Sequence, residues 1–220
     1  MIKAILFGLD GTLLDTAPDL VATLNQMRGE KGFNPIPVED LRHFVARGVG
    51  GLIKAGMPPC DDETLARWRH DFMLRSQANR YKLIRPFDGV ESLLSGLADA
   101  GVPWGIVTNK TASLCQPLLE RADYLSTASV VICGDTVGQE KPRPEPVLAA
   151  CESLGFDPQL VLMVGDDMRD IEAGRRAGCQ TAFARYGYGA AESLSDMTEE
   201  TVLIDSPADL LNLLSSAAGT

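Results

Sequence analysis

Short apolar runs typical of buried strands recur along the chain, and most are separated by segments in which apolar residues follow a helical spacing. The first run covers residues 4–9. We predict strands there and at residues 103–109, 129–133, 160–164, 180–183 and 201–204, with helices at 88–100, 111–121, 144–154, 168–177 and 207–216. Strands that alternate with helices predict right-handed βαβ units, so we expect an α/β fold with a Rossmann-like parallel sheet core.

The long segment after the first strand carries helical patterns only. Helices are predicted from about residue 17 to Gly32, at 38–46 and at 62–81, with the glycine-rich residues 48–51 as a joint. No convincing strand falls between residues 17 and 100. We therefore expect an inserted all-helical cap domain over residues 16–84, and an α/β core domain formed by residues 1–15 and 85–220.

Composition narrows the class of protein and of partner. The chain has 220 residues, 45% of them hydrophobic and 23% charged, which is typical of a soluble globular protein. Its net charge of -10 comes without a basic cluster, which argues against a nucleic-acid partner. No run reaches the length of a membrane span, and the first apolar run is too short for a secretory signal, so no membrane partner is expected.

The five cysteines are odd in number, widely spaced and without a Cys-x-x-Cys pair. This pattern argues against a disulfide framework or a structural zinc site and fits a reducing compartment. We therefore expect a cytoplasmic protein. The sequence sets no oligomeric state.

Candidate chemistry begins where the first strand ends. Side chains two apart in a strand share a face, so positions 8 and 10 point the same way at the carboxyl end, where open α/β sheets bind ligands. Gly8 and Asp10 occupy these positions, and Gly11 with Thr12 completes a turn. A site is expected directly after this strand.

Two further segments carry groups suited to a phosphate. Thr108 and Asn109 end a predicted strand with small hydrogen-bonding side chains, although helix capping explains both equally well. Lys141 opens the stretch Lys141-Pro-Arg-Pro-Glu-Pro146, in which prolines restrict the backbone and can hold a cation in place. A solitary lysine is more often solvated, so position alone leaves both interpretations open.

A third segment carries carboxylates. The stretch Val164-Gly-Asp-Asp-Met-Arg-Asp170 places two adjacent acids after a buried strand and a third acid four residues later. Mg²⁺ prefers oxygen ligands and needs few protein carboxylates, so Asp166 and Asp170 are candidate metal residues. The alternative is that Asp166 or Asp167 caps the next helix, and for Asp167 we expect this role.

These segments, taken in order, resemble the haloacid dehalogenase superfamily, whose phosphatases carry Asp-x-Asp-Gly-Thr in their first motif. Leu9-Asp-Gly-Thr12 matches the end of that motif, but Gly8 stands where the nucleophilic Asp belongs. The resemblance covers essentially the whole chain and is nearest to the phosphoglycolate phosphatase branch, including N-acetylmuramic acid 6-phosphate phosphatases. The stretches that carry this branch resemblance are Arg85–Gly89, Thr108–Lys110, Val164–Ile171 and Arg185–Tyr188.

The resemblance implies a Mg²⁺-dependent hydrolase of small phosphate monoesters, active in carbohydrate metabolism, that forms an aspartyl-phosphate. It assigns the acid/base role to Asp10, and phosphate binding to Thr108, Asn109 and Lys141. The implied Mg²⁺ ligands are the Asp10 backbone carbonyl and Asp166, with Asp170 acting through water. Arg47, in the cap, could reach a second anionic group of the substrate, although an exposed helix-end arginine explains it as well.

Gly8 removes both a nucleophile and a metal ligand, so we expect the chain as written to be inactive or strongly impaired. Three functions remain open. The first is a small-molecule phosphatase scaffold disabled at its nucleophile, with a small anionic phosphate ester as partner. The second is a non-catalytic phosphate-binding or regulatory protein, and the third a phosphomutase, which would also need the missing Asp.

Overall fold

The computed structural model describes residues 2–79, 82–189 and 200–218. The chain divides into two compact units, one formed by Met1–Leu14 with Pro86–Thr220 and the other by Asp15–Arg85. Two short strands, β2 (Leu14–Asp15) and β3 (Arg85–Pro86), lie where the chain passes between the units, and they form a two-stranded sheet. The second unit is therefore an insertion in the first.

The first unit is built on a six-stranded sheet in which every strand pair is parallel. The expected α/β fold with a parallel sheet is therefore confirmed. From edge to edge the strands are β5 (Val130–Ile132), β4 (Trp104–Val107), β1 (Ala4–Phe7), β6 (Val161–Gly165), β7 (Gln180–Ala184) and β8 (Thr201–Ile204).

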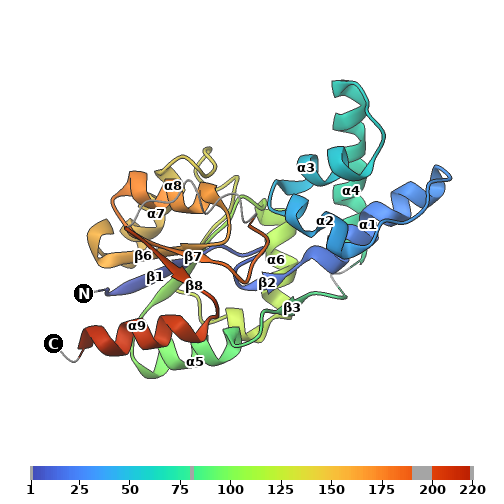
Figure 1. Ribbon diagram of the computed structural model, residues 1–220. Helices are drawn as coiled ribbons and strands as arrows, with labels where there is room; N and C mark the ends of the chain where they lie inside the picture. The colour runs from blue at the N-terminus through green and yellow to red at the C-terminus, as the bar shows by residue number, and fades with distance from the viewer. Residues whose placement is uncertain (1, 80–81, 190–199, 219–220) are drawn as a thin grey trace. The chain divides into compact units, whose positions relative to one another are not determined.

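Helices cover both faces of this sheet, with α7 and α8 on one face and α5 and α9 on the other (Figure 1). Their presence on both faces explains why the central strands are apolar on both sides. The α-helices of this unit are α5 (Val90–Asp99), α6 (Ala112–Arg121), α7 (Glu145–Leu154), α8 (Met168–Ala177) and α9 (Ala208–Ala218), and short 3₁₀ turns span Asp123–Leu125 and Pro158–Leu160.

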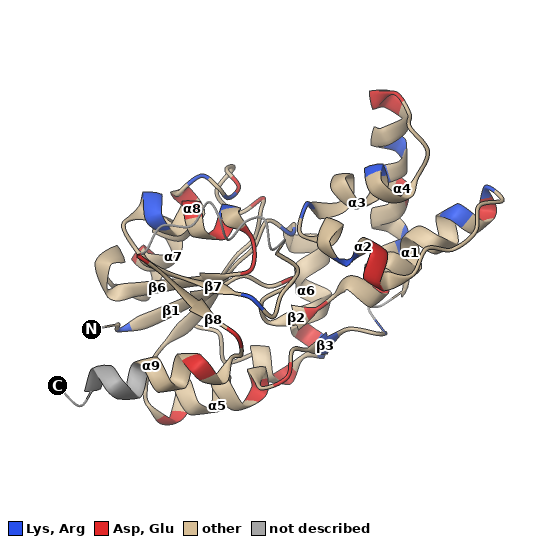
Figure 2. Ribbon diagram, viewed as in Figure 1, with Lys and Arg blue, Asp and Glu red and all other residues tan. Residues whose placement is uncertain are grey.

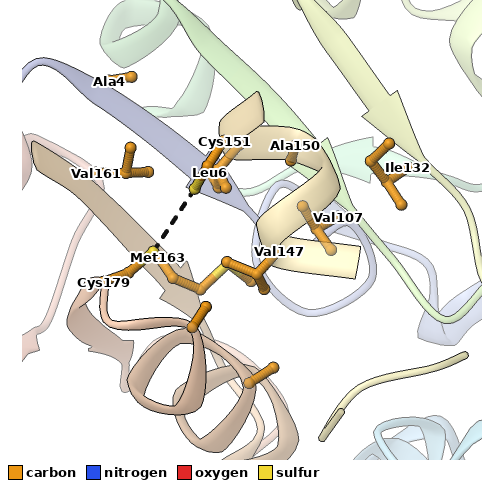
Figure 3. Close-up of a cluster of buried hydrophobic side chains, with 12 residues drawn as sticks. Ala4, Leu6, Val107, Ile132, Val147, Ala150, Cys151, Val161, Met163 and Cys179 are labelled. Carbon is orange, nitrogen blue, oxygen red and sulfur yellow. Dashed lines mark hydrogen bonds between the residues drawn. The ribbon is translucent and has the colours of Figure 1, made fainter. Parts of the chain in front are cut away.

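Strand β1 lies in the middle of the sheet, between β4 and β6. All four of its residues are fully buried, and Phe7 is paired with Ile106 on one side and Val164 on the other. Leu6 belongs to the core cluster under α7, which Figure 3 shows together with Met163 and the thiols of Cys151 and Cys179. The predicted apolar run thus forms the central strand, although the strand ends two residues earlier than expected.

All five cysteines are free thiols in this structure. The Cys151 and Cys179 sulfurs lie 3.8 Å apart within the core (Figure 3).

The charged residues of helices α5 and α9 are all acidic, because neither helix contains Lys or Arg (Figure 2). Within the described ranges, no helix is both long and apolar enough to cross a membrane.

The described residues of the second unit, 15–79 and 82–85, form four helices: α1 (Ala17–Glu30), α2 (Val38–Val45), α3 (Gly48–Gly56) and α4 (Asp62–Asn79). Arg75 of α4 pairs with Glu30 at the end of α1 and with Asp71 of α4 itself. The prediction of a glycine-rich joint at residues 48–51 is wrong, because these residues begin α3. The small side chains allow close packing there, since a Cβ on Gly51 would lie 2.4 Å from the Cβ of Arg47.

The expectation of no strand between residues 17 and 100 is also wrong, because β3 lies at Arg85–Pro86. Two residues are too short to show an alternating pattern, and this strand forms only by pairing with a segment distant in sequence.

Truncation of the core should reveal how strongly the sheet depends on the packing under α7. We expect Leu6→Ala to lower the free energy of unfolding by about 2–5 kcal/mol, because Leu6 is fully buried and the cavity cannot collapse. Urea denaturation measures this loss. Leu148→Ala is the matched control, because Leu148 lies on α7 with 40% exposure and should change stability by about 0.5 kcal/mol or less. Equal losses for both variants would contradict this account of the core.

Candidate active site

Three neighbouring strands deliver the candidate residues to one edge of the sheet. Gly8 follows β1, Thr108 follows β4 and Asp166 follows β6. The Gly8 N–H donates to the Val164 carbonyl at 2.9 Å, so the hydrogen bonding between β1 and β6 extends one residue beyond the end of β1. The strand order changes direction at β1, so these carboxyl ends lie where open α/β sheets bind ligands.

Asp166 is the most enclosed carboxylate of this cluster, with 2% exposure. The Thr12 hydroxyl donates to its Oδ1 at 2.9 Å, and the Tyr188 N–H donates to its Oδ2 at 2.9 Å. Burial, followed by the negative charge of Asp170, raises the pKa of Asp166 to about 7, although the two hydrogen bonds act in the opposite direction. A nearby cation would relieve both of the effects that raise this pKa.

Glycines allow the backbone to approach Asp166 closely. Gly11 has a φ of +81°, and a Cβ there would lie 2.0 Å from Asp166 Oδ2. A Cβ on Gly187 would lie 2.2 Å from the Gly11 carbonyl oxygen and 2.3 Å from the Asp166 Cβ. The turn after β1 and the turn after β7 can therefore close around Asp166 only because these positions lack side chains.

Lys141 is buried, in contrast to the solvated lysine that its position alone also allowed. Its ammonium group binds the Asp170 carboxylate and donates to the Val107 carbonyl at 2.5 Å. Its backbone is held by the Asn109 amide, which donates through Nδ2 to the Lys141 carbonyl and accepts at Oδ1 from the Lys141 N–H, both at 2.9 Å. The contact that the structure gives Asn109 is thus to Lys141, and its role in substrate binding stays a prediction.

Asp170 is fixed from two sides. Besides Lys141, the Asp167 N–H contacts its Oδ2 at 3.2 Å, while the Asp167 side chain accepts from the Arg169 N–H at 2.9 Å. The Asp167 side chain also accepts from the Asp170 backbone N–H, so Asp167 and Asp170 form a capping box at the start of α8, which confirms the expected capping role of Asp167. The capping box therefore also determines the orientation of Asp170.

Asp10 pairs with a residue that the motif analysis did not single out. The Lys110 ammonium lies 3.1 Å from Asp10 Oδ1, and the Lys110 N–H donates to the Thr108 hydroxyl at 3.1 Å. Thr108 is buried beside them. The sequence signal that could have identified Lys110 is its position two residues after Thr108, a candidate phosphate-binding residue.

Two tyrosines of the 185–188 stretch also belong to the site, and sequence analysis gave them no role. The Tyr186 hydroxyl donates to the Thr12 carbonyl at 3.1 Å, and Tyr188 binds Asp166 through its N–H. Burial, followed by the charge of Asp166, raises the pKa of Tyr186, so it stays a neutral donor. Phe87 packs against both rings, with centroid distances of 5.4 and 5.9 Å.

Position 8 faces the middle of this cluster. A Cβ built on Gly8 would lie 3.6 Å from Asp170 Oδ2 and 2.7 Å from Thr12 Oγ1. A side chain at position 8 would therefore enter the group of carboxylates, provided that the Thr12 hydroxyl rotates away. In the chain as written, Thr12 instead uses this hydroxyl to bind Asp166.

Residues 5–184 match the model of a family described as haloacid dehalogenase-like hydrolase. The chain belongs to the haloacid dehalogenase-like hydrolase family.

Several relatives of this hydrolase match over nearly its full length. The N-acetylmuramic acid 6-phosphate phosphatase of Pseudomonas aeruginosa is 41% identical, covering 98% of this chain and 96% of the relative. The phosphoglycolate phosphatase of Xylella fastidiosa is 39% identical, covering 93% and 90%. A crystal structure of a predicted phosphoglycolate phosphatase from Haemophilus somnus 129pt has a TM-score of 0.82 at 25% identity, covering 97% of this chain and 98% of that one.

The charges of the hydrolase site are unevenly paired. Of the carboxylates near position 8, Asp10 lies against Lys110 and Asp170 against Lys141, whereas the Asp166 carboxylate accepts from two neutral donors, the Thr12 hydroxyl and the Tyr188 N–H. Within the described residues, no three His, Cys, Asp or Glu side chains gather closely enough to form a metal site by themselves. Mg²⁺ is commonly held by one or two carboxylates with water and substrate phosphate, so Mg²⁺ binding by Asp166, with Asp170 acting through water, stays a prediction.

Arg47 lies in the other unit, so its expected contact with substrate stays a prediction. It is exposed at the start of α3, and its guanidinium lies 5.1 Å from the centre of the Phe44 ring. This cation–π contact gives Arg47 a defined role within its own unit.

Removal of the Lys141 charge should show that this lysine supports the site. We expect Lys141→Met to lower the free energy of unfolding by about 3–5 kcal/mol, because it leaves the buried Asp170 carboxylate without its cation. Urea denaturation gives the value. Adding Asp170→Asn should recover part of the loss, since the uncompensated charge is then gone.

The control for this prediction is Arg143→Met. Arg143 lies two residues away with a 61% exposed side chain, so we expect a change of about 1 kcal/mol or less. If Lys141→Met were as mild as this control, the buried ion pair would not support the site.

Proposed function

We propose that the chain is the scaffold of a Mg²⁺-dependent phosphatase of small phosphate monoesters, and that Gly8 strongly impairs it. The substrates are of the 2-phosphoglycolate type or sugar phosphates such as N-acetylmuramic acid 6-phosphate, and the setting is the cytoplasm. Near full-length relatives at 41% and 39% identity support this substrate class. The observation that carries the proposal is the surroundings of position 8. A Cβ there would lie 3.6 Å from Asp170 Oδ2, Asp170 binds the buried Lys141 ammonium, and the adjacent Thr12 binds Asp166.

Each residue has a distinct role in the proposed reaction. Thr108 and Lys141 bind the phosphoryl oxygens, and the two hydrogen bonds from Asn109 hold Lys141 in place. Asp10 donates a proton to the leaving alcohol and then accepts one from the attacking water. Asp166 and the Asp10 backbone carbonyl would hold Mg²⁺, and Asp170 would support its binding through water.

Mg²⁺, when bound, neutralises negative charge on the phosphoryl group. Lys141 contributes to the same end from the protein side, because its buried ammonium is already in place before substrate arrives. Since Asp170 orients this ammonium, the capping box of α8 indirectly supports phosphate binding.

Gly8 leaves the site without an atom that can attack phosphorus. Removal of the nucleophile from a covalent enzyme can lower turnover by about 10⁶-fold, with a residual rate from positioning and electrostatics. Phosphate recognition does not need that atom, so the chain as written should still bind phosphate esters.

A non-catalytic phosphate-binding or regulatory protein is the second candidate. The Thr12–Asp166 hydrogen bond favours it, because it places the Thr12 hydroxyl within 2.7 Å of the point where a side chain at position 8 would begin. The site is thus internally bonded without a nucleophile. A phosphomutase would need the same missing carboxylate and gains no support.

Gly8→Asp tests the proposal directly. With Mg²⁺ present, we expect phosphate release from 2-phosphoglycolate or N-acetylmuramic acid 6-phosphate to rise by at least about 10³-fold over the chain as written. Gly8→Asn is the matched control, because it has nearly the same shape but no nucleophilic carboxylate, and it should remain inert. The preferred ester then identifies the substrate.

The opposite result would support the second candidate. If Gly8→Asp and Gly8→Asn were equally inert while calorimetry still detected phosphate ester binding, the phosphatase proposal would fail.

A further inference from the structure

The backbone of Lys110 is held by hydrogen bonds on both its N–H and its carbonyl. Its N–H donates to the Thr108 hydroxyl at 3.1 Å, and its carbonyl accepts from the Gly134 N–H at 3.0 Å. A Cβ on Gly134 would lie 2.5 Å from the Asn109 carbonyl oxygen, so the chain after β5 approaches this turn closely. The backbone of Lys110 is therefore held between the ends of β4 and β5.

The side chain of Lys110 is enclosed as well. It is 8% exposed, and its ammonium lies 3.1 Å from Oδ1 of Asp10, whose side chain is 21% exposed. The Arg185–Asp205 pair is a useful contrast, because its side chains are 41% and 68% exposed. An exposed pair holds neither partner in a fixed geometry, whereas an enclosed pair restricts both.

We propose that Lys110 is a positioning residue that fixes the orientation of the Asp10 carboxyl group. Binding one oxygen from an anchored position fixes the plane of the group, and hence the direction of the other oxygen. This inference rests on the proposed function, in which Asp10 transfers protons. No motif match assigns a role to Lys110.

The consequence follows from the proton balance in a Gly8→Asp background. In the first step, the introduced carboxylate bonds to phosphorus, the bond from phosphorus to the ester oxygen breaks, and protonated Asp10 gives its proton to that oxygen. In the second step, water attacks phosphorus, loses a proton to the Asp10 carboxylate and releases phosphate and the introduced carboxylate. Lys110 takes no part in bond changes, but it determines whether Asp10 can reach the leaving oxygen.

Two substrates with different leaving groups can distinguish a positioning role of Lys110 from a merely structural one. An alkoxide must be protonated as it leaves, whereas p-nitrophenolate is stable enough to leave without a proton. We expect Lys110→Met in the Gly8→Asp background to slow single-turnover alcohol release from a sugar phosphate by about 10²-fold. Nitrophenolate release from p-nitrophenyl phosphate in a single turnover should fall by about threefold or less.

Two controls complete the kinetic test. Asp10→Asn in the same background should also slow alcohol release much more than nitrophenolate release, because it removes the proton donor. Lys110→Arg should restore most of the alcohol release, because it keeps the cation. If Lys110→Met slowed both substrates equally while Asp10→Asn split them, the positioning role would be refuted. A rise in KM confined to a carboxylated substrate would also refute it, and would indicate that Lys110 binds substrate.

A second measurement does not depend on activity. In crystal structures of the chain as written and of Lys110→Met, we expect Asp10 to lose its single side-chain orientation only in the variant. An unchanged Asp10 orientation would overturn the proposal. If Gly8→Asp proved inert but Asp10 reoriented in Lys110→Met, the positioning role would stand and the phosphatase proposal alone would fail.

Discussion

The candidate site depends on the partners that stabilise several neighbouring carboxylates at the carboxyl edge of a buried sheet. A buried carboxylate is unfavourable unless a cation or several hydrogen-bond donors accompany it. Asp170 has Lys141, Asp10 has Lys110, and Asp166 has the Thr12 hydroxyl and the Tyr188 N–H. Each pairing also fixes a direction, so the same contacts that stabilise the charges arrange the groups that would act on a phosphate ester.

Much of the fold could be predicted from the sequence because parallel strands buried on both faces must be apolar throughout. That pattern located β1 and β6 and the alternation of strands with helices. It failed where tertiary contacts decide the local structure. Gly48–Gly56 forms a helix despite its glycines, because small residues there permit close packing, and the strand at Arg85–Pro86 is too short to leave a pattern.

The candidate site divides in the same way. The positions of Thr108 and Asp166 at strand ends could be predicted from the apolar runs that precede them, whereas their roles in a site came only from the family resemblance. The contacts of Tyr188 could not be predicted, because it acts through its backbone N–H, which every residue except proline possesses. The burial of Lys141 was equally hidden, since it depends on an amide 32 residues earlier in the chain.

The pairing of β2 with β3 affects how easily evolution can replace the inserted helical unit. The helical unit leaves the parallel sheet at Leu14–Asp15 and returns at Arg85–Pro86, so its two attachment points are neighbours. An insertion whose ends already meet adds little closure entropy to its host. The helical unit is therefore modular, and it could be exchanged for a segment of another length or shape while the sheet and the charges at its edge stay as they are.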